Sequence, residues 1–448
     1  MGAFHAYDIR GIYNVDFDKY TAYKIGFFLP ELLKADKVLL GRDVRLSSDE
    51  IYDAVVEGVT DAGADVYDLG LSTTPMVYFA TARYGFDASI QITASHNSKE
   101  YNGMKVSRTN ALPVGFDTGL GEIKRWIEEG RQMKIEKEKG KVIKFDKRDD
   151  YLTFLNGYKE DYSNLKIGMD LSNGMAALFV KDIFGDQPLY ICDKMDGNFP
   201  NHEPNPLVEK NREDLKKLVL DNGCDVGVIY DGDADRVMFI DENGRFISPD
   251  LMIALLGHYF LEEKGEKGAV LQDIRSSKAV GEYLTPMGAE MHTWRVGRAF
   301  AAHKLRELNG VFGGELAGHY YFRDFYYSDS GILASLLILN VIAKLKNQGL
   351  SLSQQISRIE KYQNSGEINF KIESKKEAMD AVRDYFTSQE QPTTSFDFDG
   401  YRVEFNDWWF NVRPSNTEPY LRFLCEASTK ELLDQKVSKT KEIINNFK

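Results

Sequence analysis

Residues 224–236, CDVGVIYDGDADR, form an apolar run that passes directly into an acidic loop. A short apolar run bounded by polar turn residues is typical of a strand that is buried on both faces of a sheet. The next two runs, Val237–Asp241 and Arg245–Ile247, are joined by Glu242-Asn243-Gly244 and predict a β-hairpin. The segment therefore predicts an α/β domain in which a buried strand carries a polar loop at its carboxyl end.

The same alternation of apolar runs and helical patterns extends in both directions from this segment. Lys37–Leu40 and Ala88–Thr93 predict strands on the N-terminal side, and Ser47 or Ser48 can cap a helix that runs to about Ala62. Ile332–Lys346 predicts a buried helix on the C-terminal side. Strands that alternate with helices indicate βαβ units and a mostly parallel sheet.

The pattern divides the chain into four parts. A length of 448 residues suggests about three domains at roughly 150 residues each. A charged, glycine-containing stretch, residues 128–150, indicates the first boundary, and strand-like runs cluster between two helical segments after residue 364, as in a small α+β domain. We expect three α/β domains at residues 1–149, 150–248 and 249–363, and an α+β domain at residues 364–448.

The composition argues against several classes of function. The chain has 56 Lys and Arg against 69 Asp and Glu, and its net charge of −13 disfavours binding to nucleic acid or to an anionic membrane. The three cysteines, Cys192, Cys224 and Cys425, form no CxxC pair, which argues against a disulfide framework or a structural zinc site. The N-terminus lacks a signal pattern, and the longest apolar stretch, Ile332–Ala343, is well below the about 20 residues of a membrane span. We expect a cytoplasmic protein.

Three carboxylates alternate along the loop DGDADR, residues 231–236. Carboxylates at this spacing repel one another unless a hard cation neutralises them, so the loop predicts a divalent metal site. A solvated acidic turn is the alternative. An EF-hand loop shares the Asp spacing but needs glycine where Arg236 stands. A phosphatase-type loop of the haloacid dehalogenase kind, with Asp231 as nucleophile, usually has Thr or Val where Ala234 stands.

A second candidate loop is Thr93-Ala94-Ser95-His96-Asn97, which follows a predicted strand. A serine at this edge of an α/β sheet lies where ligands bind, so Ser95 is a candidate nucleophile. Adjacent side chains of an extended chain point to opposite sides, and we therefore expect His96 to be a poor base for Ser95. The Gly-x-Ser-x-Gly pattern of hydrolases is absent, and a capped turn is the alternative.

Two further loops carry groups that suit a phosphorylated sugar. Residues 413–419, RPSNTEP, place an arginine beside Ser, Asn and Thr donors, which together can surround a phosphate. Residues 313–319, GGELAGH, combine small residues with Glu315, which can accept hydrogen bonds from sugar hydroxyls, and His319, which can exchange protons near neutral pH. Each pattern alone is also typical of an ordinary polar turn or of a structural histidine.

These four loops, in this order, resemble the α-D-phosphohexomutase superfamily, especially its bacterial phosphomannomutase/phosphoglucomutase members. The resemblance extends over nearly the whole chain. It rests on YDIRG (7–11), TASHN (93–97) with YNGMK (101–105), DGDADR (231–236), GELAGH (314–319), RPSNTEP (413–419) and FPNHEPNP (199–206).

The resemblance implies three related α/β domains with mixed sheets around a central cleft, and a C-terminal α+β domain of TATA-box-binding-protein-like fold. It implies that Ser95 is a phosphoserine in the resting enzyme, and that one Mg²⁺ per chain is held by this phosphoserine with Asp231, Asp233 and Asp235. Lys105 and His319 would transfer protons, and Arg10 would orient the reacting hydroxyl. The substrate-binding residues would be Arg236, Glu315, Ala317, Arg413, Ser415, Asn416 and Thr417.

The activity that the resemblance implies is the interconversion of hexose 6-phosphate and hexose 1-phosphate, of mannose and/or glucose. A hexose 1,6-bisphosphate would be both the intermediate, which reorients in the cleft, and the activator. Leu316 favours this type over a glucosamine-type mutase, whereas Arg298 and Ala317 depart from the common His and Ser and leave the preferred hexose open. The alternatives are a phosphoglucosamine mutase, a phosphatase or bisphosphate synthase with an aspartyl nucleophile, and a non-catalytic sugar-phosphate-binding relative. We expect a monomer or homodimer.

Overall fold

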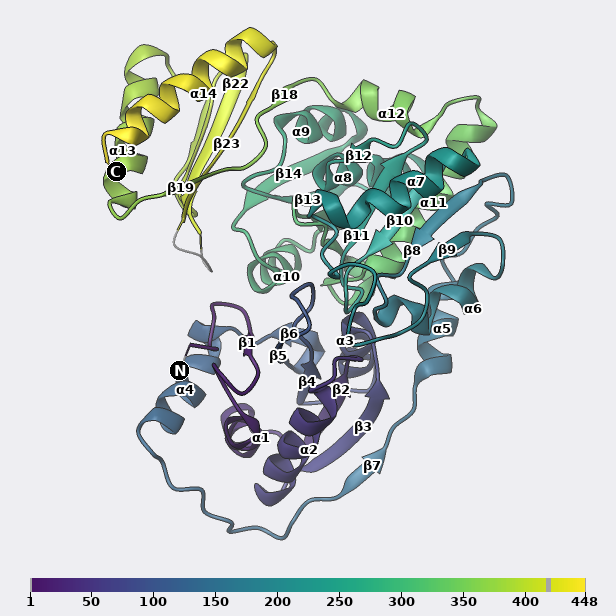
Figure 1. Ribbon diagram of the computed structural model, residues 1–448, viewed down its shortest axis with the longest axis vertical. Helices are drawn as coiled ribbons and strands as arrows, with labels where there is room; N and C mark the ends of the chain where they lie inside the picture. Colours follow the sequence, from purple (N-terminus) through teal and green to yellow (C-terminus); the bar gives the residue numbers. More distant parts are fainter. Residues whose placement is uncertain (1, 416–419, 448) are drawn as a thin grey trace.

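Apolar runs form the inner strands of the first of four sheets in the computed structural model, which describes residues 2–415 and 420–447 (Figure 1). Val38, Leu39 and Leu40 are fully buried there, as the sequence predicts for a strand covered on both faces. In spatial order its strands are β1 (Ile9–Ile12), β5 (Tyr101–Arg108), β4 (Ala88–Ile92), β2 (Lys37–Arg42), β3 (Asp65–Leu71) and β7 (Val142–Lys144), with β6 (Leu112–Pro113) beside β5. Its helices are α1 (Lys19–Leu33), α2 (Ser48–Asp61), α3 (Thr74–Arg83) and α4 (Leu120–Glu128).

The second and third sheets share one plan, in which three parallel strands are extended by two antiparallel ones. The second sheet has the order β12 (Phe246–Ile247), β11 (Val237–Asp241), β10 (Val226–Tyr230), β8 (Ile167–Asp170), β9 (Leu189–Ile191). The third has the order β14 (Ala289–Trp294), β13 (Gly268–Asp273), β15 (Phe312–Gly314), β16 (Tyr320–Phe322), β17 (Ser328–Asp329). The main helices beside them are α5 (Arg148–Asn156), α6 (Val180–Phe184), α7 (Glu213–Asn222), α8 (Pro249–Gly257), α9 (Lys278–Leu284), α10 (Arg298–Glu307), α11 (Gly331–Asn347) and α12 (Leu352–Ile359).

The fourth sheet is antiparallel and carries both of its helices, α13 (Lys375–Gln389) and α14 (Lys430–Asn445), on one face (Figure 1). Its strands follow the order β18 (Gln363–Asn364), β23 (Tyr420–Ala427), β22 (Trp408–Pro414), β21 (Tyr401–Glu404), β20 (Thr394–Phe396), and β19 (Ile368–Lys371) also pairs with β23. The expected α/β architecture with a final α+β unit is confirmed. The first three sheets are mixed rather than mostly parallel, because hairpin strands extend each parallel core.

One apolar core joins the second sheet to the third. Helix α11 lies in this core. Ser330 caps its N-terminus, where the Ser330 side chain accepts a hydrogen bond from Leu333 N. The backbone N–H of Gly331, the first residue of α11, donates to Ala234 O at 3.1 Å. The shared core thus fixes the loop after β10 relative to the loops of the third sheet.

Among the described residues, no helix combines the length and the apolar character that crossing a bilayer would require.

Candidate active site

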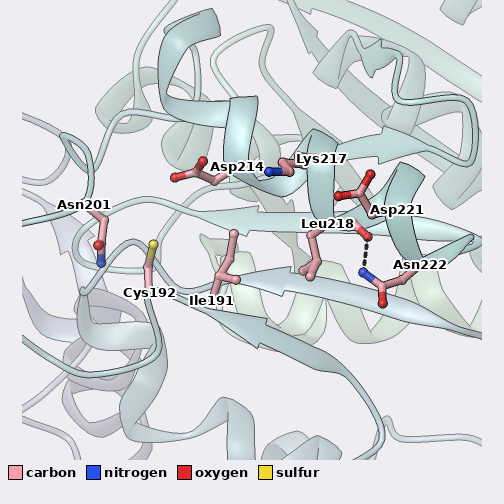
Figure 2. A pocket seen from close by; sticks show the side chains of 8 residues that line it. All are labelled: Ile191, Cys192, Asn201, Asp214, Lys217, Leu218, Asp221 and Asn222. Carbon is pink, nitrogen blue, oxygen red and sulfur yellow. Dashed lines mark hydrogen bonds between the residues drawn. The ribbon is translucent and has the colours of Figure 1, made fainter.

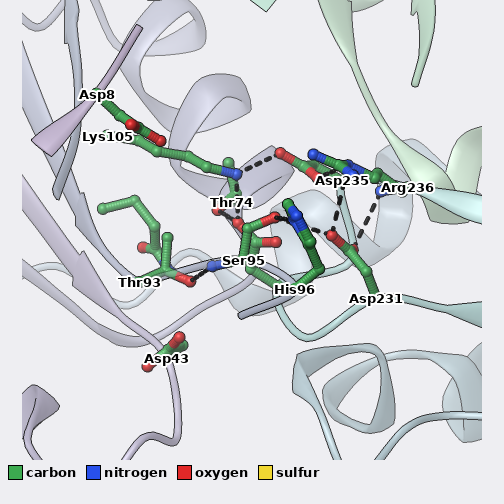
Figure 3. A network of polar contacts seen from close by, with 12 residues as sticks. Asp8, Asp43, Thr74, Thr93, Ser95, His96, Lys105, Asp231, Asp235 and Arg236 are labelled. Carbon is green, nitrogen blue, oxygen red and sulfur yellow. Dashed lines mark hydrogen bonds and ion pairs between the residues drawn. The ribbon is translucent and has the colours of Figure 1, made fainter. Parts of the chain in front are cut away.

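The loops after β4 and β10 meet, and they bring Ser95 to Asp231 (Figure 3). Ser95 Oγ donates a hydrogen bond to Asp231 Oδ2 at 2.9 Å, and both residues are fully buried. Gly232 makes the approach possible, because a Cβ at this position would lie 2.4 Å from Ser95 O. The sequence patterns of the two loops therefore belong to one site.

The backbone at Ser95 is not extended, so the premise that the side chains of Ser95 and His96 point to opposite sides is wrong, although the expectation that His96 is a poor base is not contradicted. Ser95 has a φ of 52°, and this left-handed conformation turns the imidazole of His96 back toward Ser95, with Nδ1 at 3.4 Å from Oγ. Burial, and then the positive charge of Arg236, hold the pKa of His96 well below its usual value. The serine proton is nevertheless donated to Asp231, which is the nearer acceptor.

A buried arginine holds the Ser95 loop in this conformation. The guanidinium of Arg45 donates to the backbone oxygens of Ser95, Asn97, Ser98 and Tyr101 at 2.6–3.0 Å. Its Nε lies 3.1 Å from Asp43 Oδ2, which supplies the compensating charge. Four carbonyl acceptors on one planar cation fix the loop far more tightly than its own short-range contacts could.

The three carboxylates of the acidic loop converge in a volume that suits a single cation. One oxygen each of Asp231, Asp233 and Asp235 lies within 4.8 Å of the others, and all three residues are fully buried. Oδ1 of Asp233 and Oδ1 of Asp235 are buried without a hydrogen-bond partner among the described residues. Buried, unpaired carboxylate oxygens are costly unless a cation binds them. The residues present therefore fit a divalent ion.

In the structure, the ammonium of Lys105 compensates part of this negative charge. Lys105 Nζ lies 2.6 Å from Asp233 Oδ2 and 2.5 Å from Asp235 Oδ2. Thr74 Oγ1 also donates to Asp233 Oδ2. Burial lowers the pKa of Lys105, but attraction by Asp233 and Asp235 outweighs it, and the net shift is upward. Lys105 is therefore a protonated group in this arrangement.

The acidic loop residues titrate in opposite directions. Burial, and then repulsion from Asp233 and Asp235, raise the pKa of Asp231 well above its usual value. Burial acts in the same sense on Asp235, but Lys105 counteracts it and the pKa of Asp235 is lowered. Asp231, which accepts the hydrogen bond from Ser95, is thus more basic than Asp235.

His319 is held between a donor and an acceptor. Its Nδ1 lies 2.6 Å from Asp329 Oδ2, and its Nε2 accepts from Arg236 Nε at 2.9 Å, which places the imidazole proton on Nδ1. Arg298 donates to the other oxygen of Asp329 at 2.9 Å and lies over the ring of Tyr78 at 3.6 Å. Burial raises the pKa of Asp329, but His319 and Arg298 reverse this and lower it to about 2.

A cavity of about 160 Å³ adjoins this cluster. Arg10 lines it and donates to Asn97 Oδ1 at 2.9 Å. Glu315 also lines it, and its two oxygens accept hydrogen bonds from Tyr321 OH and from Gly297 N. The remaining residues predicted for the site that line the cavity are Lys105, Asp235, Arg236, Ala317 and His319.

The loop of the fourth sheet contacts the third through Asp399. Arg413 Nε donates to Asp399 Oδ1 at 3.1 Å, and Asp399 Oδ2 accepts from Val296 N, at the rim of the cavity, at 2.9 Å. Nη2 of Arg413 is buried and has no hydrogen-bond partner among the described residues, so it is a donor available to an anion. Ser415 N donates to Tyr420 O, whereas Asn416 and Thr417 lie outside the described residues.

Sequence reasoning missed three residues of the site. Arg45 follows β2 in the segment GRDVR, and its signal was the same as that of the chosen loops, polar residues at the carboxyl end of a buried strand. Thr74 begins α3, and Asp329 precedes the cap of α11. A polar residue at the start of a helix is common, so the sequence does not show that these two residues contact the candidate site.

Comparison with family models agrees with this arrangement along the whole chain. Four descriptions match in order: phosphoglucomutase/phosphomannomutase alpha/beta/alpha domain I at residues 1–134, domain II at residues 149–244, domain III at residues 248–362, and the C-terminal domain at residues 367–442.

Curated relatives are similar over their full lengths. The chain is 36% identical over 453 residues to a phosphomannomutase of Escherichia coli strain K12, covering 97% of this chain and 98% of that protein. It is 37% identical over 465 residues to a phosphomannomutase of Vibrio cholerae, covering 100% and 99%. A Xanthomonas campestris protein named phosphohexose mutases is 36% identical over 451 residues, with 99% of each chain covered.

Solved structures agree with the fold. A phosphoglucomutase/phosphomannomutase family protein of Burkholderia thailandensis has a TM-score of 0.89 and 26% identity, covering 99% of this chain and 97% of that chain. The open form of Paramecium parafusin, a phosphoglucomutase, has a TM-score of 0.75 and 18% identity, covering 95% and 90%, and shares the fold.

Proposed function

Because the chain belongs to the phosphoglucomutase/phosphomannomutase family, it is a hexose phosphate mutase, and we propose that Ser95 carries the phosphate that it transfers. The observation that carries the proposal is the 2.9 Å hydrogen bond from Ser95 Oγ to Asp231 inside a buried cluster of carboxylates. A serine in such a cluster is an acceptor for phosphate rather than a surface modification site, since the cluster adjoins a cavity lined by Arg10, Lys105 and His319.

The reaction consists of two phosphoryl transfers in opposite directions. In the first, the P–O bond to Ser95 breaks, a P–O bond to the free sugar hydroxyl forms, and the hydroxyl proton passes to a base of the site. The product is a hexose 1,6-bisphosphate. In the second, its other phosphate returns to Ser95 and a proton returns to the sugar oxygen. One site must therefore accept the sugar in two orientations, and the bisphosphate must reorient before the second transfer.

The metal in this proposal is Mg²⁺, one per chain, held by Asp231, Asp233 and Asp235 with an oxygen of phosphorylated Ser95. The ligand set consists of oxygen atoms only, three of them from carboxylates, which is the kind of set that hard divalent ions prefer. When bound, Mg²⁺ neutralises negative charge on the phosphoryl group. Lys105 pairs with Oδ2 of Asp233 and of Asp235 here, so it contacts two of the three carboxylates that would hold the ion.

Proton transfer falls to Lys105 and His319, with Arg10 as an orienting group. Both proton-transfer residues line the cavity. His319 Nε2 is occupied by Arg236, so it becomes a base only when Arg236 turns to another acceptor, such as a substrate phosphate. Arg236 would then bind substrate and release His319 in the same movement.

The phosphate that is not being transferred is assigned to Arg413, Ser415, Asn416 and Thr417. Nη2 of Arg413, which has no hydrogen-bond partner within residues 2–415 and 420–447, supports this assignment. Glu315 and Ala317 line the cavity where the sugar hydroxyls would lie. Both oxygens of Glu315 already accept hydrogen bonds, so a hydroxyl would add to or replace the donor Gly297 N or Tyr321 OH.

The sugar is proposed to be mannose or glucose phosphate, with hexose 1,6-bisphosphate as the activator. The curated relatives named phosphomannomutase support mannose. The alternatives of a glucosamine-type mutase, an aspartyl phosphatase and a non-catalytic relative are not favoured by these relatives. A coupled assay of the purified protein with mannose 1-phosphate, glucose 1-phosphate and glucosamine 1-phosphate, each with Mg²⁺ and a trace of bisphosphate, tests the preference.

The assignment of Ser95 is tested with Ser95→Ala. We expect turnover to fall by at least about 10⁴-fold, because the variant lacks the group that accepts and returns the phosphate. Intact-mass measurement should find one phosphate on the unaltered chain and none on the variant.

Ser98→Ala is the matched control, because Ser98 lies on the same loop and contacts Arg45 only through its backbone oxygen. It should keep the phosphate and most of the activity. A hydroxylamine-labile phosphate on Asp231 would instead assign the chain an aspartyl nucleophile.

A further inference from the structure

A second group of potential metal ligands lies at the carboxyl edge of the second sheet, apart from the acidic loop. It consists of Asp170, Cys192 and His202, and one ligand atom of each lies within 4.8 Å of the others. Asp170 ends β8, and Cys192 follows β9, which pairs with β8 in parallel. Parallel neighbours bring both residues to one edge of the sheet, where α/β proteins bind ligands.

Backbone groups bond to one polar atom each of His202 and Asp170. The remaining nitrogen of His202 and the remaining oxygen of Asp170 face each other. Nδ1 of His202 lies 2.8 Å from Glu203 O, and Nε2 lies 3.0 Å from Asp170 Oδ2. The other oxygen of Asp170 accepts from Ser172 N at 2.8 Å. Donation of Nδ1–H to a backbone oxygen is typical of metal-ligating histidines, but Nε2 also faces an acceptor here, so a proton lies between Nε2 and Asp170 and must leave before an ion binds.

The backbone at Cys192 supports the same interpretation. Cys192 has a φ of 50°, a conformation that side-chain-bearing residues adopt at a cost, and Cys192 O accepts from Asn173 N at 2.8 Å. Asp170 is fully buried, while Cys192 is half-buried. The site thus combines a fixed interior carboxylate with a thiol that solvent can reach.

A pocket of about 420 Å³ connects Cys192 to the surface (Figure 2). Figure 2 shows Cys192 and Asn201 at one end of the pocket and Asp221 and Asn222 at the other. Asp214 and Asp221 of α7 are exposed at its wall, with Lys217 between them. A cation can therefore reach the thiol without any rearrangement of the fold, and two carboxylates line its path.

We propose that Asp170, Cys192 and His202 form a binding site for a thiophilic divalent transition ion, of the Zn²⁺ type. Thiolate, imidazole and carboxylate together are a ligand set for Zn²⁺ and not for Mg²⁺. A tetrahedral ion with bonds of about 2.0–2.3 Å needs ligand atoms roughly 3.3–3.8 Å apart. His202 Nε2 and Asp170 Oδ2, now 3.0 Å apart, must therefore separate slightly, and Cys192 must rotate toward them. Water would supply the fourth ligand. The Cys192 thiol proton, and the proton between His202 and Asp170, leave to solvent on binding.

This site differs from the structural zinc site that the absence of CxxC pairs argues against, because it uses one cysteine from a strand end. It also has a structural link to the acidic loop. Met175 N donates to Gly232 O at 2.8 Å, and Pro204, two residues after His202, borders Gly232. An ion bound to His202 and Asp170 would restrain the segments that carry Met175 and Pro204, which both contact Gly232.

The test is titration of the metal-stripped full-length protein with Co²⁺ in the presence of saturating Mg²⁺. Cobalt bound to a thiolate gives an intense near-ultraviolet charge-transfer band, which a site of carboxylates cannot give. We expect the band to saturate at one Co²⁺ per chain and to disappear on addition of one equivalent of Zn²⁺. Cys192→Ser should abolish the band, and His202→Gln should weaken Zn²⁺ binding by at least about 10-fold.

Cys224→Ala is the matched control, because Cys224 is a buried thiol of the same sheet domain outside the group, and its variant should keep the band. Circular dichroism and thermal melting identify any variant that fails to fold, and His202→Gln and Cys192→Ser then serve as independent checks on each other. Absence of a band in the unaltered protein would reduce the group to a His202–Asp170 ion pair and overturn the proposal. Persistence of the band in Cys192→Ser would overturn it as well.

Discussion

Lys105 Nζ lies 2.6 Å from Asp233 Oδ2 and 2.5 Å from Asp235 Oδ2, so its ammonium pairs with two of the three carboxylates proposed to hold the metal. The pKa of Lys105 is raised, since the two carboxylates outweigh the effect of burial. In this state Lys105 can donate a proton but cannot accept one. A divalent ion on the same carboxylates would offset their negative charge and lower the pKa of Lys105 from this raised value.

Lys105→Met should therefore change metal binding and turnover in opposite directions. We expect Mg²⁺ to bind about 10-fold more tightly, because a competing positive charge is lost near its ligands. We expect kcat to fall by about 10²–10⁴-fold, because the proposed proton-transfer group is lost. Isothermal titration with Mg²⁺ and the coupled assay measure the two effects.

Lys124→Met is the matched control, because Lys124 lies in α4 and pairs with Glu128 on the surface. It should leave both quantities unchanged. Weaker Mg²⁺ binding by Lys105→Met would show that the lysine supports the metal ligands rather than competing for them.

At the scale of elements, the site depends on the close approach of the loops after β4 and β10. The sequence predicted both strands within two residues and placed a polar loop after each. It could not predict the left-handed backbone at Ser95, because four hydrogen bonds from Arg45 impose that conformation from a different segment. Local propensity therefore identified the loops, and tertiary contacts determined how their side chains point.

The same distinction explains the role of Asp329. A residue just before a helix cap is expected in almost any helix, and only the folded arrangement of β17 and β16 brings Asp329 to His319. The motif containing His319 was recognisable because several unusual residues occur together in it. A single carboxylate in an ordinary helix start gives no such signal.

Gly232→Ala tests the approach of the two loops. A Cβ at this position would lie 2.4 Å from Ser95 O, so the loops must separate. Because a displacement of about 1 Å at a reacting group costs roughly 10²-fold, we expect kcat to fall by about that factor. Steady-state kinetics and thermal melting separate misplacement from unfolding.

Gly281→Ala is the control for this substitution, because the nearest atom to a Cβ there is 3.7 Å away and the residue lies within α9. It should preserve kcat and raise stability by roughly 0.5–1 kcal/mol. Full activity in Gly232→Ala would mean that the two loops need not touch during turnover.

At the scale of the whole molecule, the fourth domain contacts the third through polar groups and through the rings of Trp294 and Phe398, whose centroids lie 5.2 Å apart. Arg402 donates to Ile274 O and Ser276 O, and Lys278 Nζ donates to Phe405 O. Glu426 Oε2 accepts from Ser277 Oγ at 2.7 Å. Polar contacts permit relative motion of domains more readily than apolar ones, and motion of the fourth domain would give the bisphosphate of the proposed reaction room to reorient.

Glu426 makes this interface sensitive to pH. Burial, and then repulsion from Asp250, raise its pKa from 4.5 to about 7. Between these two values the folded protein keeps a proton on Glu426 that the unfolded chain has lost. The free energy of unfolding therefore falls as the pH rises through this window, by up to about 1.4 kcal/mol per pH unit, and the effect is complete above the folded pKa.

Glu426→Gln keeps the side chain neutral at every pH and should remove this dependence. Although the variant loses one acceptor for Trp409 Nε1, Ser277 Oγ or Asn364 Nδ2, that loss is the same at every pH. Between pH 5 and pH 8, we expect the melting temperature of the unaltered protein to fall relative to that of Glu426→Gln. Glu431→Gln is the control, because Glu431 is exposed on α14, and its melting temperature should follow that of the unaltered protein. Parallel melting curves for the unaltered protein and Glu426→Gln would mean that Glu426 titrates normally, and the interface between the third and fourth sheets would then be insensitive to pH near neutrality.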